Sequence, residues 1–392
     1  AWPPVLSPAE HKTEALLAGT AAIDEPFARK LRLVAGVNRR SAYDGYLTTS
    51  DDMATAIRQK IIEISPTDLE HYGECPQRFL IRKLLGVREL EDPEHEVQID
   101  RRKKGGLDHR ILERFYSQLR KEEIESGFFG RKLSPPLAAR LKRAIDEEFE
   151  KHNIESPPVN TVMREIEEGY TLSLLEEFVA TDLADLARTG FVPQEFEYGF
   201  GLTPESPPFT FSSGGVTIKL RGQIDRIDAR GNPVEKLRII DYKSGKALKQ
   251  QGLADNIDEG HSFQLALYAI AYGTLASLPD SAIQGVIKPI RIQGLKEEDY
   301  SFELAEKRPL LDAALDLFLG AIVRGEFPAI PAKYCEYCAV AASCRTRHDV
   351  EEKQRLEEFG NAMTLLKTFQ VPGSKFQGEE PGTWNVEPGT QR

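Results

Sequence analysis

The chain has 392 residues, of which 40% are hydrophobic and 29% charged, so it is long enough for two or three folded domains. It carries 51 basic and 62 acidic side chains and a net charge of -11, which excludes a coat of nonspecific DNA-binding charge but permits a local basic channel. No run of about 18 apolar residues occurs, so no membrane span is predicted. The four cysteines are too few for a disulfide scaffold and fit a reducing cytoplasm.

Residues 1–63 are expected to form a lead-in segment, the remnant of a preceding domain, that packs on the next domain. The first residues match neither a signal peptide nor a natural start, so we expect an excised part of a longer protein. Helical character is predicted over 9–18 and 27–40. Ser65, Pro66 and Asp68 then provide an N-cap, a first-turn proline and a capping partner for a helix.

Further elements follow from hydrophobic periodicity and turn residues. Helices are predicted over 101–115, 134–152, 161–189, 262–276 and 305–324, and strands over 193–200 and 283–292, the latter as the last core strand. Residues 204–213, rich in proline and serine, are predicted to be a loop. Residues 246–260 are expected to form a DNA-contacting loop that offers Lys246 and Lys249, and the chain should end in a helix and flexible tail over 351–392.

The chain is organised around residues 222–245, where two strand-like runs meet at a turn at Gly231. Each run carries an acid, Asp225 and Asp241, at a position where alternation would place an apolar residue, and Lys243 follows two residues later. Side chains at i and i+2 share a face of a strand, so Asp241 and Lys243 point the same way and a hairpin brings Asp225 beside them. Two carboxylates and an ammonium in an apolar sheet must pair with each other or bind a cation.

Two interpretations of this hairpin are open. In the first, Asp225 and Asp241 hold Mg²⁺ or Mn²⁺, which prefer oxygen ligands, and Lys243 orients a water or stabilises developing charge at a phosphodiester. In the second, Asp241 and Lys243 form an ordinary surface ion pair that contributes little to stability.

The segments Gly222-x-x-Asp225-Arg226-Ile227-Asp228 and Asp241-Tyr242-Lys243-Ser244-Gly245 resemble motifs II and III of the RecB-like branch of PD-(D/E)XK nucleases. The resemblance implies an α/β fold with a restriction-endonuclease-like core, in which a mixed central β-sheet is flanked by helices, together with added helical segments. It also implies hydrolysis of DNA phosphodiester bonds. It covers residues 64–348, and we expect residues 64–350 to be the nuclease domain.

Three further positions follow from the same resemblance. Gly105-x-x-x-His109-x-x-Leu112-Glu113 is similar to motif I, in which the histidine is a third metal ligand beside Asp225 and Asp241, and the Tyr242 carbonyl is expected to be a further ligand. Imidazole suits Mn²⁺ better than Mg²⁺, so Mn²⁺ should support activity at least as well. Gln264-x-x-x-Tyr268 resembles the motif that distinguishes the RecB-like branch. Glu197 aligns with a family glutamate, but a strand-face charge is its expected role.

Three of the four cysteines are close in sequence, in the pattern Cys335-x-x-Cys338-x5-Cys344, and the fourth, Cys75, lies far before them. This pattern, with Ser65-Pro66-Thr67-x-Leu69-x-x-Tyr72 before Cys75, resembles AddB-type helicase–nuclease subunits and CRISPR-associated RecB-like exonucleases. The resemblance implies a [4Fe–4S] cluster that joins the two ends of the domain. Zinc bound by four cysteines is the alternative.

The resemblance therefore implies a metal-dependent deoxyribonuclease, an exonuclease that acts on single-stranded or end-bearing DNA in end processing and recombinational repair. No G-x-x-x-x-G-K-[ST] sequence is present, so a helicase partner must lie outside this chain. The alternatives are a catalytically silent DNA-guiding subunit, a CRISPR-associated-type exonuclease and a restriction-type endonuclease that cuts closed circles.

Overall fold

The structure is a computed structural model that describes residues 45–47, 50–87, 101–155, 160–213, 215–243, 262–290, 300–330, 335, 338 and 340. The elements predicted over 9–18, 27–40, 246–260 and 351–392 lie outside these residues, as does Cys344. In the part that is described, no helix combines the length and the apolar character needed to cross a membrane.

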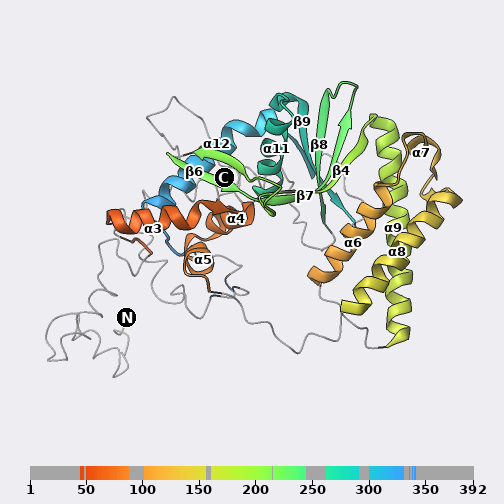
Figure 1. The fold of residues 1–392 in the computed structure, drawn as a ribbon, viewed down its shortest axis with the longest axis horizontal. Coiled ribbons are helices and arrows are strands. Elements are labelled where there is room, and N and C mark those ends of the chain that lie inside the picture. The colour runs from red at the N-terminus through yellow and green to blue at the C-terminus, as the bar shows by residue number, and fades with distance from the viewer. Residues whose placement is uncertain are drawn as a thin grey trace, which may run out of the picture.

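A mixed five-stranded sheet forms the centre of the fold, in the order β10-β9-β8-β7-β4 (Figure 1). Its strands are β4 (Val192–Phe200), β7 (Gly222–Arg230), β8 (Lys236–Lys243), β9 (Ile283–Pro289) and β10 (Ser301–Glu303). Only β8 and β9 run parallel, while the other neighbours are antiparallel. The predicted hairpin is confirmed as β7–β8. The predicted last core strand is β9, but β10 follows it at the edge of the sheet.

Two smaller sheets accompany the central one. The first has the order β1-β6-β5 and is built from β1 (Glu63–Ile64), β6 (Val216–Leu220) and β5 (Phe209–Ser213). The second pairs β2 (Phe128–Phe129) with β3 (Lys132–Leu133). The loop predicted over 204–213 is therefore wrong in its second half, because Phe209 and Phe211 alternate toward the core and β5 pairs with β6 along its length.

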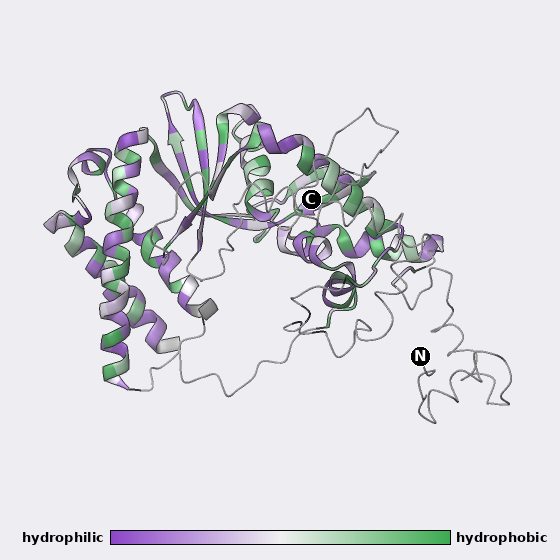
Figure 2. Ribbon diagram, turned by 180° about the vertical axis from the view of Figure 1, so that it is seen from behind, coloured by the Kyte–Doolittle hydropathy of each residue, from purple (hydrophilic) through white to green (hydrophobic). Residues whose placement is uncertain are grey.

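Helices cover both faces of the central sheet (Figure 1). One group is α3 (Asp51–Ile61), α4 (Pro66–Glu74), α11 (Gln264–Leu275) and α12 (Leu304–Val323), and the other is α6 (Arg101–Tyr116), α7 (Lys121–Ser126), α8 (Pro135–Glu155) and α9 (Thr161–Thr189). Strand alternation divides the core accordingly, since Ile239 packs with the first group and Ile240 with the second. Figure 2 shows hydrophobic and hydrophilic residues alternating along α8 and α9, as predicted for amphipathic helices.

The beginning and the end of the described domain pack against each other. The predicted capping box is present, since Ser65 Oγ accepts the Asp68 N–H at 3.2 Å and Asp68 Oδ2 accepts the Ser65 N–H at 3.0 Å. The Tyr72 hydroxyl of the capped helix donates to the Glu326 carbonyl at 2.7 Å. Three short elements, α5 (Pro76–Phe79), the π-helical turn η2 (Leu80–Leu84) and the 3₁₀ turn η4 (Asp280–Ala282), complete the fold.

Candidate active site

The β7–β8 hairpin brings Asp225, Asp241 and Lys243 together as the sequence predicts. The two strands pair through Arg226 and Ile240, so the two aspartates lie one step further along the ladder. Asp225 Oδ2 accepts the backbone N–H of Tyr242 at 2.6 Å. Lys243 Nζ lies 3.0 Å and 2.7 Å from the two oxygens of Asp241. Both aspartates are thus held in place from β8.

His109 reaches the hairpin from α6. Its Nδ1 lies 3.4 Å from Asp225 Oδ1 and 4.0 Å from Glu197 Oε1. The ligand atoms of these three residues all lie within 4.8 Å of one another. Burial opposes a charged imidazole, but the hydrogen bond and charge of Asp225 prevail and raise the pKa of His109. The predicted meeting of His109 with Asp225 is therefore present.

Glu197 joins this group, which corrects the expectation that it is only a strand-face charge. The pairing of β4 with β7 shifts register between Pro193 and Glu195, and Glu197 itself has φ of 46°. A bulge changes the direction of a side chain, and a left-handed non-glycine residue in a strand is strained, as is common at functional sites. Burial and the nearby Asp225 charge raise the pKa of Glu197 to about 7. In the part of the chain described, its buried Oε1 has no hydrogen-bond partner.

These observations fit a divalent cation. Carboxylate oxygens are the preferred ligands of Mg²⁺ and Mn²⁺, and imidazole suits Mn²⁺. Asp241 lies outside the group of three, with both oxygens near Lys243, but burial and the charge of Asp225 raise its pKa despite the opposing effect of Lys243. A cation would relieve this repulsion between neighbouring carboxylates. Coordination by Asp241 and by the Tyr242 carbonyl remains a prediction.

Gln264 and Tyr268 approach the hairpin from α11, on the face opposite to His109. Gln264 Nε2 lies 3.4 Å from Asp241 Oδ1. The Tyr268 ring packs against Gly222, where a Cβ atom would lie only 2.4 Å from the ring. Gly222 is thus required because the tyrosine approaches the backbone closely. The two residues of the predicted motif act differently, since Gln264 contacts an acid of the site and Tyr268 packs against the strand that carries Asp225.

Glu70 supports the site from α4, although nothing in the sequence indicates this role. Its Oε1 accepts the backbone N–H groups of Phe263 and Gln264, at 2.8 Å and 2.9 Å, at the start of α11. Burial raises its pKa to about 7, although both hydrogen bonds and the charge of Lys243 oppose the shift. The partner residues lie 193 and 194 positions away, so no local spacing could have indicated the contact.

A buried ionic network explains why the motif continues after Asp225 with Arg226 and Asp228. Arg226 is fully buried and binds Asp228 through Nε at 2.8 Å and Nη2 at 2.9 Å. Its Nη1 donates to Asp182 of α9 at 2.7 Å and to the Tyr242 hydroxyl at 2.9 Å. The Tyr116 hydroxyl of α6 also donates to Asp182, at 2.5 Å. The helix that carries His109 is therefore tied to the strand that carries Asp225.

The described cysteines lie where the two ends of the domain meet. Cys75 is buried at the start of α5, and the next turn of chain is held by a hydrogen bond from Gln77 N to Pro328 O at 3.2 Å. Cys338 N donates to Cys335 O at 3.4 Å. The sulfurs of Cys75, Cys335 and Cys338 do not all lie within 4.8 Å of one another, whereas ligands of one tetrahedral zinc ion would lie about 3.8 Å apart. The predicted four-cysteine centre is untested, since Cys344 lies outside the described residues.

The fold and site together define an α/β protein with a carboxylate-rich centre and an adjoining lysine on a mixed sheet. The chain belongs to the PD-(D/E)XK nuclease superfamily, whose family model matches residues 63–345.

Curated relatives match a part of this chain. The chain is 27% identical over 227 residues to a subunit of the ATP-dependent helicase/deoxyribonuclease of Clostridium tetani, covering 56% of this chain and 18% of that protein. The subunit of the same name from Moorella thermoacetica is 28% identical over 58% of this chain and 18% of its own length. The subunit of the same name from Acetivibrio thermocellus is 30% identical over 46% of this chain and 15% of its own length. The matched region is thus less than a fifth of each of these three relatives.

Proposed function

We propose that this chain is the nuclease module of a helicase–nuclease and that it hydrolyses DNA phosphodiester bonds with Mg²⁺ or Mn²⁺. The observation that carries the proposal is the convergence of His109, Glu197 and Asp225 within 4.8 Å, beside the Asp241–Lys243 pair. The superfamily match and the names of the relatives support the same chemistry.

The side chains of the site have two proposed roles in hydrolysis, cation binding and stabilisation of charge on the phosphate. His109, Glu197, Asp225 and Asp241 would hold the cation, which lowers the pKa of a bound water and neutralises charge on the phosphate when present. Hydrolysis adds the water hydroxyl to phosphorus and its proton to the departing oxygen. Lys243 Nζ carries three N–H donors and its side chain is 42% exposed, so it can donate to a phosphate oxygen as charge develops there while it stays beside Asp241.

Gln264 and Glu70 hold this arrangement in place. Gln264 contacts Asp241, and Glu70 fixes the first residues of α11 from which Gln264 projects. The pair therefore restricts the Asp241 carboxylate to one orientation while Lys243 binds it from β8. Such restraint matters because small displacements of reacting groups lower rates steeply.

The substrate is proposed to be an end-bearing or single DNA strand delivered by a helicase outside this chain. The relatives' names join a helicase to a deoxyribonuclease, and the matched range is a small part of each. The net charge of -11 agrees with a local channel rather than a broad basic surface.

A [4Fe–4S] cluster on Cys75, Cys335, Cys338 and Cys344 is proposed to hold the two ends of the domain together. Thiolates are soft ligands suited to iron, and the hydrogen bond between Gln77 and Pro328 already places the two segments side by side. Purified protein should be brown and contain iron, and Cys338→Ala should lose both the colour and thermal stability. A colourless protein with stoichiometric zinc would overturn the cluster.

The nuclease itself is tested by incubating the purified chain with Mn²⁺ or Mg²⁺ and two substrates, end-labelled linear DNA and a closed circle. The proposal predicts degradation of linear DNA, no cutting of the circle, and no activity in Asp241→Ala. A folded protein that binds DNA without cleaving it under any of these conditions would instead be the silent guiding subunit.

A further inference from the structure

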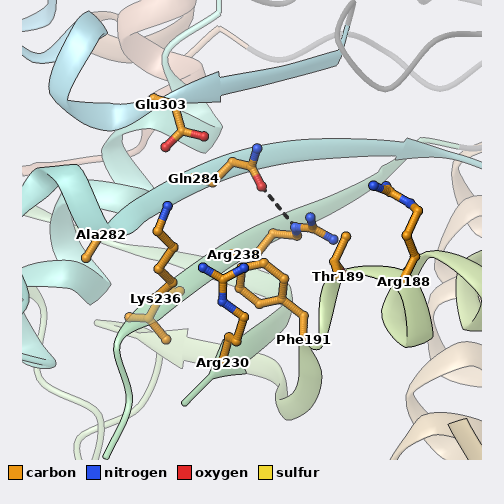
Figure 3. A pocket seen from close by; sticks show the side chains of 10 residues that line it. Arg188, Thr189, Phe191, Arg230, Lys236, Arg238, Ala282, Gln284 and Glu303 are labelled. Carbon is orange, nitrogen blue, oxygen red and sulfur yellow. Dashed lines mark hydrogen bonds between the residues drawn. The ribbon is translucent and has the colours of Figure 1, made fainter. Parts of the chain in front are cut away.

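A basic pocket lies at the end of the central sheet away from the aspartates. It has a volume of about 360 Å³. Figure 3 shows cationic side chains from three elements converging around it. The charged residues that line it are Arg188, Arg230, Lys236, Arg238 and Glu303. Four positive groups and one acid thus line the pocket, and Asp185 pairs with two of the four, Arg188 at 2.7 Å and Arg238 at 2.8 Å, which leaves Arg230 and Lys236 as the cations without an ion pair among the described residues.

The two strands of the catalytic hairpin connect this pocket to the aspartates. Arg230 ends β7 and Lys236 begins β8, whereas Asp225 lies five residues before Arg230 on β7. At about 3.4 Å per residue, the pocket is about 17 Å from Asp225 along the strand. It is therefore separate from the proposed cation site.

The pocket holds its positive charges in an unfavourable arrangement. Arg230 and Lys236 are direct partners in the β7–β8 ladder, and like charges opposite each other destabilise a sheet. The guanidinium of Arg230 also lies 5.3 Å from the centre of the Phe191 ring, and that of Arg238 lies 4.3 Å from the same ring. Two cations thus share one aromatic ring. An anion bound between these groups would relieve their repulsion.

Part of the pocket is rigid and part is available to a ligand. Arg238 is 3% exposed and is fixed by Asp185, at 2.8 Å, and by the Gln284 side chain, at 3.0 Å (Figure 3). Arg230 and Lys236 make no ion pair with any residue that the structure describes, and Lys236 is exposed. Arg238 is therefore a rigid part of the pocket lining, while the side-chain N–H donors of Arg230 and Lys236 contact no acceptor among the described residues.

We propose that this pocket binds a phosphate group, carried either by DNA or by a free nucleotide or inorganic phosphate. Guanidinium groups present paired donors that match phosphate oxygens, and lysine adds a compact charge. The Thr189 hydroxyl and the Gln284 amide line the same space as neutral polar groups. The volume is in the range of small-molecule sites and exceeds what one phosphate needs. The existence of the site does not depend on the proposed nuclease activity, but DNA as its ligand does.

The test uses the full chain in EDTA, because without a cation the carboxylate-rich centre repels anions. Calorimetry measures binding of inorganic phosphate, a deoxynucleoside monophosphate and a single-stranded oligonucleotide at low salt. The test variant is Arg230→Gln with Lys236→Gln, in which neither change breaks an ion pair with a described residue. The matched control is Lys132→Gln with Lys219→Gln, which removes two exposed charges elsewhere.

The wild type and the control should bind alike, and the test variant should lose about tenfold or more in affinity, with weaker binding at higher salt. If the test variant loses affinity for the oligonucleotide alone, DNA is the ligand. If it loses affinity equally for all three probes, the ligand is a free phosphate. Equal affinities in the test variant and the control overturn the site, as does a wild type that binds none of the probes. Cleavage assayed in parallel with Mn²⁺ separates this result from the nuclease proposal, which fails only if the wild type does not cut.

Discussion

The Glu70 carboxylate accepts the backbone N–H of Gln264 at 2.9 Å, and the side chain of that same glutamine reaches Asp241 at 3.4 Å. A residue of α4 therefore fixes the first turn of α11 and, through it, the orientation of an acid on β8. Backbone N–H groups in the first turn of a helix have no partner within the helix, so a buried carboxylate there replaces water. Glu70 thus acts on the site without touching it.

Removing this contact should slow turnover more than it weakens DNA binding. Glu70→Ala leaves two buried N–H groups without their acceptor, which should cost about 1 kcal/mol in the free energy of unfolding and release Gln264. We expect turnover to fall by about tenfold or more, since misplaced reacting groups lower rates steeply. Glu70→Gln, which keeps an acceptor oxygen, should recover most of the rate.

The matched control for Glu70 is Glu74→Ala on the same helix. Glu74 pairs with Arg78 of α5, and the ion pair includes no residue of the site, so its loss should leave turnover unchanged. Steady-state cleavage of labelled DNA and thermal unfolding of all three variants provide the comparison. Equal turnover in Glu70→Ala and Glu74→Ala would show that α11 needs no support from α4.

Glu197 should contribute to cation binding. Glu197→Gln keeps the size of the side chain but removes its charge, so Mn²⁺ affinity measured by calorimetry should fall by at least about tenfold. The matched control is Glu195→Gln, an exposed acid two residues earlier on the same strand, which should bind Mn²⁺ as the wild type does.

A further variant separates the carboxylate of Glu197 from its backbone. Glu197→Gly tolerates the φ of 46° without strain, so the protein should fold while cation binding stays weak. Wild-type Mn²⁺ affinity in both Glu197 variants would exclude this residue from the cation site.

Much of the site could be predicted because its residues are close to one another in the sequence. Asp225, Asp241 and Lys243 belong to one hairpin, whose strands are indicated by alternation and whose turn is indicated by Gly231. The capping box at Ser65 likewise depends on neighbours three residues apart. The mixed sheet followed from the family resemblance and is confirmed.

The features that could not be predicted from the sequence depend on contacts between segments that are far apart in the chain. Glu197 looked like a surface charge because the bulge that redirects it arises from the register of β4 against β7. Arg226 belongs to the motif around Asp225, but its full burial could not be predicted, because its partner Asp182 lies on a helix 44 residues earlier. The strand β5 was missed because its flanking prolines and serines indicate a loop, and only its pairing with β6 reveals a strand.

Lys243 should act in turnover rather than in cation binding. Lys243→Ala removes a donor toward the phosphate but no ligand, so Mn²⁺ affinity should be retained while turnover falls by about 10²–10³-fold, as for the loss of one donor to developing charge. Lys219→Ala, an exposed lysine of β6, serves as the control. Unchanged cleavage by Lys243→Ala would exclude this lysine from the reaction.

The buried pair of Asp182 and Arg226 should control stability toward acid. Burial alone would raise the pKa of Asp182, but Arg226 and Lys288 prevail and lower it below the ordinary 3.8. The folded state therefore holds this proton less tightly than the unfolded chain does. The stabilisation from Asp182 is complete above the ordinary pKa and is lost as the pH falls through and below it.

Asp182→Asn should accordingly destabilise the protein by about 3–5 kcal/mol at neutral pH, because it leaves a buried arginine with fewer partners. The loss of unfolding free energy below about pH 5 should also be smaller than in the wild type. Asp146→Asn, which breaks an exposed pair with Lys142, should change stability by less than about 1 kcal/mol and leave the acid dependence unchanged. Urea unfolding at a series of pH values measures both effects.

A second variant keeps the prediction testable if Asp182→Asn does not fold. Lys288→Gln removes one of the two cations that lower the pKa of Asp182, so the loss of stability in acid should become smaller in part. Parallel acid profiles for the wild type and these variants would show that the ion pairs of Asp182 do not determine acid stability.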